Sequence, residues 1–347
     1  MIQIGKRRIG EAEPCFIIAE AGSNHNGSLD QARRLIDIAS EAGADAVKFQ
    51  LFRADRMYPK NAGISGYLKS PKTIYDIISE MEMPYEWLPR LQAHCQERKI
   101  LFFASVFDEE SADRLDPYVE AFKIASYELT HHPLVRHVAL KGKSMILSTG
   151  TANLDEVKET IREIEKTGNE NFSLMQCTAA YPAPLESLNL RVIPALKEIF
   201  GVPVGLSDHS RDPVVAPLAA VGIGANLLEK HFTLSNRLPG PDHPFALEPP
   251  ELKQMIREIR QAEKAMGNGQ KVMQPVETEL RSFARRSIFS VREIQAGETF
   301  SRENIAVLRR GVRTPGLEPK DFPRLLGKRA LRRILLESSI QWEDILS

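Results

Sequence analysis

The chain lacks several features that would each indicate a particular class of protein. Its 347 residues include three cysteines, Cys15, Cys95 and Cys177, which are widely spaced and odd in number. This spacing excludes a disulfide framework and a CxxC metal site. No apolar run approaches the roughly 20 residues of a membrane span, and the first residues carry no apolar segment typical of a secretory signal. Lys+Arg and Asp+Glu are equal at 46 each, which argues against a globally basic nucleic-acid-binding protein. We therefore expect a cytoplasmic globular protein that binds neither nucleic acid nor membrane.

The charge is unevenly distributed along the chain. Residues 281–347 carry 14 Lys+Arg against 8 Asp+Glu, a net charge of +6, so the preceding residues carry −6. The segment 267–275, rich in glycine, asparagine and glutamine and ending in proline, is typical of a linker. We predict a first domain over residues 1–268, a linker over 269–280 and a second domain over 281–347. Domains of opposite charge would attract each other within or between chains.

Eight short apolar runs in the first domain are each predicted to form a β-strand. They cover residues 16–20, 46–50, 100–106, 121–126, 144–149, 172–177, 204–207 and 227–232. Between most of them lie segments with helical periodicity, such as 29–41, 154–166 and 213–221. Glycines in 41–47 and 222–228 stand between a helix and a strand, as left-handed caps do. Eight strand–helix repeats over about 250 residues favour a (β/α)8 TIM barrel over an open doubly wound sheet.

Polar side chains end nearly every predicted strand. In a (β/α)8 barrel, the loops at the carboxyl ends of the strands build the active site. Lysine and hydroxyl groups there are suited to binding phosphate or carboxylate. These are Lys48, Lys123, Ser126, Ser148 and Ser207. Glu20 and Glu128 are candidates for acid–base catalysis, or for binding sugar hydroxyls or a lysine. A single lysine is more often a solvated surface residue, but a ring of such groups predicts an anion-binding pocket.

Two histidines, His209 and His231, end the seventh and eighth predicted strands. Adjacent barrel strands run about 4.8 Å apart, so the two imidazoles can share one metal ion. A lone histidine is more often structural, but a pair at equivalent strand ends favours a metal site. With oxygen ligands completing the shell, Mn²⁺ fits better than a structural zinc, and Mg²⁺ or Co²⁺ are alternatives.

The motifs at these strand ends resemble the sialic acid synthase (N-acetylneuraminate synthase) family. They are FIIAEAGSNHNG (16–27), AVKFQ (46–50), KIASYE (123–128), ILSTG (146–150), GLSDHS (205–210), EKHF (229–232) and LPGPDH (238–243). Residues 283–309 resemble that family's small, β-rich antifreeze-like (SAF) domain. The segments MEMP (81–84) and PGPDHPFAL (239–247) look closest to the branch that makes spore-coat polysaccharide, and KIASYE is also similar to pseudaminic acid synthases.

The resemblance implies a reaction between phosphoenolpyruvate and the open-chain aldehyde of an N-acetylated hexosamine, such as N-acetylmannosamine. The products are a nonulosonic acid, destined for a cell-surface or spore-coat polysaccharide, and phosphate. Water attacks C2 of the phosphoenolpyruvate portion, so the C–O bond breaks. His209 and His231 would hold Mn²⁺, which would polarise the aldehyde.

The resemblance also assigns roles to individual residues. The phosphoenolpyruvate contacts would be Lys48, Ser105, Lys123, Ser126, Ser148 and Ser207. The sugar contacts would be Gln50, Tyr181, Asp242 and Arg309, together with Glu128. The catalytic groups would be Glu20, Glu128 and Lys48. In this family, the SAF domain reaches the barrel of the partner subunit and contributes an arginine to the acyl group of the sugar. Arg309 aligns best with that arginine, so a domain-swapped homodimer is expected.

Departures from the family pattern leave the hexosamine open. Ala179 stands where neuraminate synthases have asparagine, and Arg310 replaces a proline that is common after the arginine. A legionaminic or pseudaminic acid synthase is therefore an alternative. More distant alternatives are another barrel 3-deoxy sugar acid synthase, a Schiff-base aldolase that uses Lys48 or Lys123, and an inactive carbohydrate-binding protein.

Overall fold

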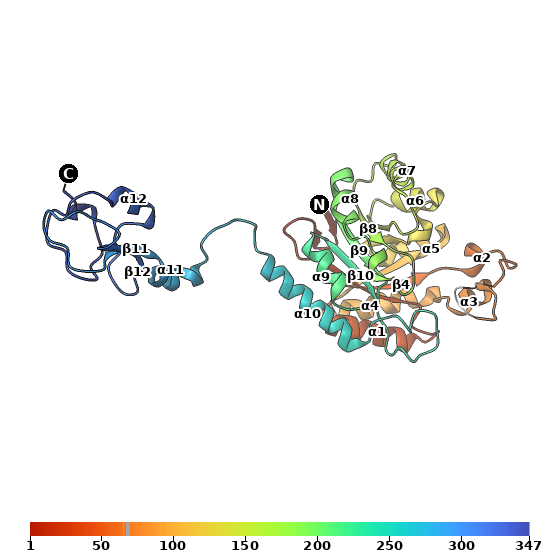
Figure 1. The fold of residues 1–347 in the computed structure, drawn as a ribbon. Helices are drawn as coiled ribbons and strands as arrows, with labels where there is room; N and C mark the ends of the chain where they lie inside the picture. The colour runs from red at the N-terminus through yellow and green to blue at the C-terminus, as the bar shows by residue number, and fades with distance from the viewer. Residues whose placement is uncertain (65, 67–69, 347) are drawn as a thin grey trace. The chain divides into compact units, whose positions relative to one another are not determined.

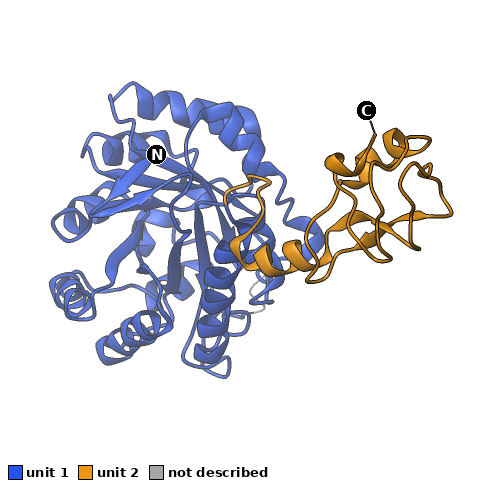
Figure 2. Ribbon diagram, turned by 90° about the vertical axis from the view of Figure 1, so that its left-hand side faces the viewer, with its two compact units in different colours: residues 1–267 blue, residues 268–347 orange. Residues whose placement is uncertain are grey.

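The chain forms two compact units. The structure is a computed structural model that describes residues 1–64, 66 and 70–346. Unit 1 comprises residues 1–267 and unit 2 residues 268–347 (Figure 2). The division falls one residue before the end of the predicted first domain. The segment predicted as a linker, 269–280, contains the 3₁₀ turn η5 (Pro275–Glu277) and the start of α11 (Thr278–Ala284).

Unit 1 is a closed barrel of eight parallel strands, so the predicted fold class is confirmed. The strands are β3 (Phe16–Gly22), β4 (Ala46–Leu51), β5 (Leu101–Val106), β6 (Ala121–Ile124), β7 (Ser144–Ser148), β8 (Phe172–Cys177), β9 (Val204–Asp208) and β10 (Leu227–His231). The barrel closes where β10 pairs with β3, with His231 opposite Glu20. Because all eight strands are parallel, their carboxyl ends lie on one rim.

Helices surround the barrel (Figure 1). They are α1 (Leu29–Ala42), α4 (Leu88–Glu97), α5 (Glu109–Leu115), α6 (His132–Ala139), α7 (Leu154–Glu165), α8 (Val192–Phe200), α9 (Val215–Gly222) and α10 (Pro249–Met266). Shorter helices lie in the connections: α2 (Ala54–Met57), α3 (Ile74–Glu80), η1 (Tyr85–Trp87), η2 (Asp116–Tyr118), η3 (Ser126–Glu128) and η4 (Leu185–Ser187). The two expected left-handed glycines follow α1 and α9, since Gly43 has φ +89° and Gly224 has φ +96°.

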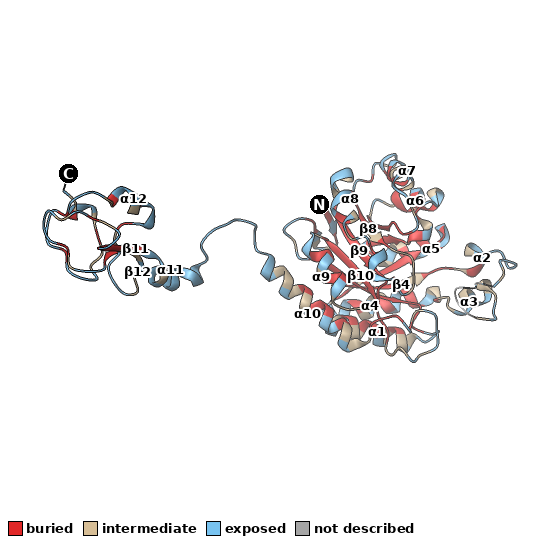
Figure 3. Cartoon of the chain, viewed as in Figure 1, coloured by how far each residue is buried: buried red, intermediate tan, exposed pale blue. Residues whose placement is uncertain are grey.

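The strand alternation divides the apolar side chains of unit 1 between two cores. Outward-facing residues pack against the helices, and inward-facing residues such as Phe16, Phe103 and Met175 fill the barrel. The inner core also includes Ile4 and Ile9 from the hairpin of β1 (Ile2–Ile4) and β2 (Arg7–Ile9), which was not predicted. Buried residues concentrate in the barrel strands (Figure 3). The amino-terminal half of the barrel is therefore apolar, and the carboxyl end is left for polar groups.

Unit 2 is small and contains the antiparallel pair β11 (Arg286–Ser290) and β12 (Ile305–Arg309). Isolated bridges such as Ile294–Ile334 extend the β structure. Short helices accompany it: η6 (Pro319–Asp321), α12 (Phe322–Leu325) and η7 (Trp342–Asp344). Its core is separate from that of the barrel and includes Ile288, Phe300 and Ile340. Across residues 1–64, 66 and 70–346, no helix has both the length and the apolar character of a membrane span.

Candidate active site

Strand register brings the predicted side chains to one rim of the barrel. Glu20 lies opposite Lys48, Gln50 opposite Ser105, and Ser105 opposite Lys123 in the parallel pairings. On the other side of the barrel, Glu229 lies opposite Ser207. Side chains two residues apart on a strand point to the same face, so each of these groups reaches the interior at the carboxyl end.

Lys48 is the centre of a buried ionic cluster. Its Nζ lies 2.7 Å from Oε2 of Glu20 and 3.5 Å from Oε1 of Glu229, and it donates to Oγ of Ser105 at 3.0 Å. Glu20 also accepts a hydrogen bond from Nε2 of Gln50 at 3.1 Å. Lys48, Glu20 and Glu229 are all at most 5% exposed, so one ammonium is shared by two carboxylates inside the barrel.

Glu229 was not among the predicted site residues. A signal for it existed, because Glu229 stands two residues before His231 and therefore faces the same side of β10. Its hydroxyl neighbour Ser207 donates to Oε1 of Glu229 at 3.3 Å. Glu229 thus links the Lys48 cluster to the predicted phosphoenolpyruvate contacts.

The two carboxylates at Lys48 titrate differently. Burial raises the pKa of Glu20 to about 7, in opposition to Lys48. Burial also raises the pKa of Glu229, but Lys123 and Lys48 outweigh it and bring that pKa below its ordinary value. Near neutral pH, Glu229 is therefore ionised, while Glu20 is partly protonated. Two carboxyl groups whose pKa values are pushed apart provide an acid and a base in one site.

Lys123 forms a second cationic position on the rim. Its Nζ donates to Oγ of Ser148 at 2.7 Å and to the carbonyl of Ile124 at 3.0 Å. Burial lowers the pKa of its ammonium group. In the part of the chain that the structure describes, no carboxylate lies within 4.0 Å of Lys123. A buried cation that has hydroxyl partners but no paired carboxylate is suited to an anionic ligand.

Ser126 lies close to the same rim, where its Oγ accepts from the backbone N–H of Gly150 at 3.1 Å. A Cβ at position 150 would lie 2.8 Å from Oγ of Ser126 and 3.0 Å from Sγ of Cys177. Glycine therefore permits the close approach of the two loops. This approach gives Ser126 a backbone donor and brings its hydroxyl within hydrogen-bonding reach of Cys177.

The two predicted metal ligands are adjacent. The ring centroids of His209 and His231 are 5.3 Å apart, and the Tyr181 ring lies 4.2 Å from that of His209. Nδ1 of His209 lies 2.9 Å from the carbonyl of Thr178, which places a proton on Nδ1 and turns Nε2 away from this acceptor. Burial lowers the pKa of His209, but contacts with Cys177 and Thr178 outweigh it and raise that pKa above its ordinary value. Nδ1 of His231 is buried without a hydrogen-bond partner, 3.6 Å from Oδ2 of Asp242. Burial, followed by the neighbouring His209, lowers the pKa of His231 well below its ordinary value, so its ring is neutral.

The imidazole pair fits a metal ion that takes its other ligands from outside the protein. Neutral imidazole is the form that binds metals. Among the described residues, no group of three or more His, Cys, Asp or Glu side chains is arranged to hold an ion. Two protein ligands leave the remaining positions to water or substrate, as in a site where an ion contacts its reactant.

The predicted sugar contacts divide between the two units. Three polar groups meet beside Gly22 at one edge of the rim. A Cβ placed on Gly22 would lie within 3.5 Å of Oδ2 of Asp242, Nε2 of Gln50 and Oε1 of Glu20. Burial raises the pKa of Asp242 to about 6 and that of Glu128, which lies in η3, to about 7. Arg309 lies in unit 2, exposed at the end of β12 and opposite Arg286.

The fold and this rim define a class: a (β/α)8 barrel whose mouth carries buried lysines, carboxylates and imidazoles, followed by a small β-rich unit. Residues 35–271 match the NeuB family and residues 285–346 match the SAF domain. The chain belongs to the NeuB family, which confirms the resemblance seen in the sequence.

The curated relatives cover nearly the whole chain. It is 48% identical to the spore coat polysaccharide biosynthesis protein SpsE of Bacillus subtilis, over 99% of this chain and 97% of that protein. It is 37% identical to an N,N'-diacetyllegionaminic acid synthase of Legionella pneumophila, over 97% of this chain and 96% of that protein. A solved N-acetylneuraminic acid synthetase of Leptospira borgpetersenii, in complex with citrate, is 35% identical with a TM-score of 0.73. The match covers 80% of this chain and 94% of the solved Leptospira chain.

Proposed function

We propose that the chain condenses phosphoenolpyruvate with the aldehyde of an N-acetylated hexosamine, releasing phosphate and a nonulosonic acid. The observation that carries this proposal is the pair of buried lysines, Lys48 and Lys123, on one rim with the hydroxyls of Ser105 and Ser148. Phosphoenolpyruvate carries two anionic groups, and two buried cations with hydroxyl partners match them. Relatives named as synthases of legionaminic, pseudaminic and neuraminic acids support the same reaction.

The chemistry requires three bond changes at the phosphoenolpyruvate: a C–C bond forms at C3, a C–O bond to water forms at C2, and the C–O bond to phosphate breaks. Its C3 attacks the aldehyde carbon, and the aldehyde oxygen becomes a hydroxyl. Positive charge develops at C2, which captures water, and the C–O bond to phosphate then breaks. We assign orientation of that water to Glu20, and acceptance of its proton to Glu229, because Glu229 has the lower pKa of the two and is the ionised member of the pair.

The phosphoenolpyruvate itself would be held by the cations and hydroxyls of the rim. Lys123 and Ser148 form one anion-binding position, and Lys48 with Ser105, beside Glu20 and Glu229, forms the other. Ser126 and Ser207 complete this set. Because each lysine is already hydrogen-bonded to its serine, and Ser126 and Ser207 to Gly150 and Glu229, these groups are fixed before substrate enters, which lowers the cost of ordering them on binding.

His209 and His231 would hold Mn²⁺ or a similar divalent ion. When bound, the ion would polarise the aldehyde oxygen. We expect EDTA to abolish phosphate release and Mn²⁺ to restore it. Turnover that persists in a metal-free preparation would contradict this assignment.

Gln50, Tyr181, Asp242 and Glu128 would bind the hydroxyl and amide groups of the hexosamine. Arg309 of the partner subunit would complete the sugar site, in a domain-swapped homodimer supported by the net charge of +6 on residues 281–347 and −6 on the rest. We also propose a cytoplasmic location for the enzyme.

The test is phosphate release from phosphoenolpyruvate against a panel of N-acetylhexosamines that includes N-acetylmannosamine and its 4-amino and 6-deoxy derivatives. We expect release to depend on one of them and to be accompanied by a nine-carbon 2-keto acid, detected by mass spectrometry. The preferred sugar distinguishes a neuraminic from a legionaminic or pseudaminic acid synthase. Borohydride treatment with substrate should trap no adduct, whereas an adduct on Lys48 or Lys123 would indicate a Schiff-base aldolase.

A further inference from the structure

The outward face of the barrel strands carries one charged pair, Asp208 on β9 and Lys230 on β10. All eight strands lie within the described residues. Their other outward positions are apolar, apart from the uncharged Gln176, and pack in the core between barrel and helices. Lys230 lies directly opposite Asp208 in the strand register. A buried ion pair therefore joins the two strands that also carry His209 and His231.

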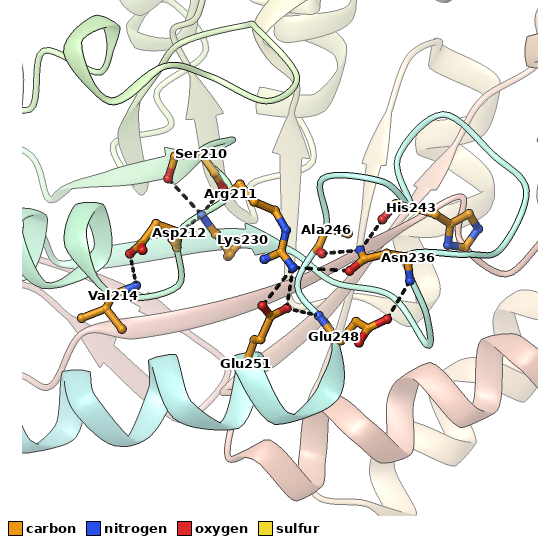
Figure 4. Close-up of polar contacts among 10 residues, drawn as sticks. All are labelled: Ser210, Arg211, Asp212, Val214, Lys230, Asn236, His243, Ala246, Glu248 and Glu251. Carbon is orange, nitrogen blue, oxygen red and sulfur yellow. Dashed lines mark hydrogen bonds and ion pairs between the residues drawn. The ribbon is translucent and has the colours of Figure 1, made fainter.

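The contacts of this pair surround His209. Nζ of Lys230 lies 2.6 Å from Oδ2 of Asp208, and the two side chains are 2% and 0% exposed. Lys230 also donates to the carbonyl and hydroxyl of Ser210 and to the carbonyl of Asp212 (Figure 4). Oδ1 of Asp208 accepts from the backbone N–H of Ser210 at 2.8 Å. The main chain that immediately follows His209 is thus held to the strand of His231 by a single ammonium group.

Arg211 extends this network to the next loop of the rim. Its guanidinium donates to both carboxylate oxygens of Glu251 on α10 at 2.9 Å, and to Oδ1 of Asn236 at 3.3 Å (Figure 4). Nδ2 of Asn236 in turn donates to the carbonyl of His243 at 2.6 Å. His243 follows Asp242, whose carboxylate lies beside His231. The loops on either side of the imidazole pair are therefore fixed to each other through side chains.

Stability alone does not explain charges at this position. Removing two charges from water is costly, and replacing a buried ion pair by apolar residues is often neutral or stabilising. Apart from Gln176, the other outward positions of the barrel strands are occupied by apolar residues. What the Asp208–Lys230 pair supplies is a fixed geometry, since it ties the main chain just after His209 to the strand that ends in His231.

We propose that Asp208 and Lys230 are positioning residues that hold His209 and His231 at the separation required to bind one divalent ion. This inference rests on the proposed function. Groups that hydrogen-bond metal ligands directly typically contribute roughly 10–100-fold to metal affinity, and Asp208 and Lys230 would act one residue away, through the main chain beside each ligand.

The decisive variant is the double substitution Asp208→Asn with Lys230→Met, which removes both charges without leaving either one buried alone. We expect its melting temperature to stay close to that of the wild type. We expect its Kd for Mn²⁺, measured by electron paramagnetic resonance with saturating phosphoenolpyruvate, to rise roughly 10–100-fold. Binding of phosphoenolpyruvate without metal should change less than Mn²⁺ binding, because Lys48 and Lys123 lie on other strands and Ser207 is the one proposed contact on β9.

Arg260→Met is the matched control. Arg260 pairs with Asp45 at 2.9 Å near the amino ends of the strands, where Asp45 also accepts from the backbone N–H of Ile17. Its loss should lower the melting temperature and leave the Kd for Mn²⁺ unchanged. The control and the double variant should therefore show opposite patterns of stability and metal affinity.

The outcomes separate this inference from the proposed function. A stable double variant that binds Mn²⁺ within twofold of wild type, while His231→Ala has lost binding, overturns the positioning role and leaves the metal site intact. Unchanged Mn²⁺ binding by His231→Ala overturns both the positioning role and the metal site of the proposed function. Should the double variant fail to fold, Arg211→Gln decides the question. A several-fold weaker Mn²⁺ affinity with unaltered phosphoenolpyruvate binding supports the role, and an unaltered Mn²⁺ affinity overturns it.

Discussion

At the scale of single residues, the two carboxylates on Lys48 have different electrostatic roles. Glu229→Gln keeps the shape of the side chain and removes its charge. Because the Glu229 carboxylate helps to raise the pKa of Glu20, that pKa should fall in the variant. We expect kcat to drop about 100-fold or more through loss of the base, with the KM for phosphoenolpyruvate changing less. In the residual activity, the change of rate with pH that follows ionisation of Glu20 should move to lower pH.

Phosphate-release kinetics between pH 5 and 9 measure kcat, the KM for phosphoenolpyruvate and the pH dependence of the rate. Glu263→Gln is the control, because Glu263 accepts from the backbone N–H of Cys15 at the start of the first barrel strand, away from the rim. Unaltered kcat in Glu229→Gln would contradict the role assigned to this carboxylate.

The buried carboxyl group of Glu128 should make the stability of the folded protein depend on pH. Burial raises its folded-state pKa from the ordinary 4.5 to about 7, partly opposed by Lys123. The folded state therefore binds the proton more tightly, so this residue favours folding below about pH 4.5 and loses that contribution as the pH rises through 7. Glu128→Gln should be more stable than wild type at pH 8, by about 2 kcal/mol after solvent screening. The difference should disappear near pH 5.

Urea unfolding of the substrate-free protein at pH 5, 6, 7 and 8 measures this dependence. Glu159→Gln, on the outer helix α7, gives the baseline. Equal stability of wild type and Glu128→Gln at pH 8 would show that the carboxyl is not strained by burial.

Much of the rim was predictable because strand ends are visible in the sequence. A strand has a period of two, so Lys48, Lys123 and Glu20 could be placed on the rim once the apolar runs were found. Glu229 was harder, since three consecutive ionisable residues end β10 and the phase of the strand decides which face inward. The same ambiguity applies to Lys230, which lies between the two inward-facing residues and points outward. Its role depends on partners in a loop that no local pattern predicts.

At the scale of elements, the β1–β2 hairpin was missed because strands of three residues are too short to show periodicity. Ile4 is fully buried in the inner core of the barrel. We expect Ile4→Ala to cost about 2–4 kcal/mol of stability through the cavity it leaves. The KM values should be unchanged, because the hairpin packs in the apolar amino-terminal half and not at the rim.

Thermal unfolding together with steady-state kinetics tests this separation. The exposed Lys6→Ala, in the turn of the same hairpin, should change neither quantity. A large rise in the KM for phosphoenolpyruvate in Ile4→Ala would mean that packing at the base of the barrel also controls the geometry of its mouth.

At the scale of the whole molecule, the proposed domain swap can be tested by complementation. Lys48→Met inactivates the barrel mouth, and Arg309→Ala should raise the KM for the sugar more than that for phosphoenolpyruvate. In a swapped dimer, a mixed pair contains one barrel with Lys48 that receives Arg309 from the other chain. Co-expressed variants should therefore regain about a quarter of wild-type sites, because half the dimers are mixed and each has one complete site.

Each variant expressed alone should show the defect in full, and mixing two preparations that cannot exchange subunits should restore nothing. Recovery in the co-expressed sample, measured at a sugar concentration well below the KM of Arg309→Ala, requires that residues from two chains meet in one site. Without a swap, every barrel retains the arginine of its own chain, so a Lys48→Met barrel stays inactive and an Arg309→Ala barrel stays weak whatever its partner. Activity equal to the mean of the two single variants would therefore assign Arg309 to its own barrel or to no barrel at all.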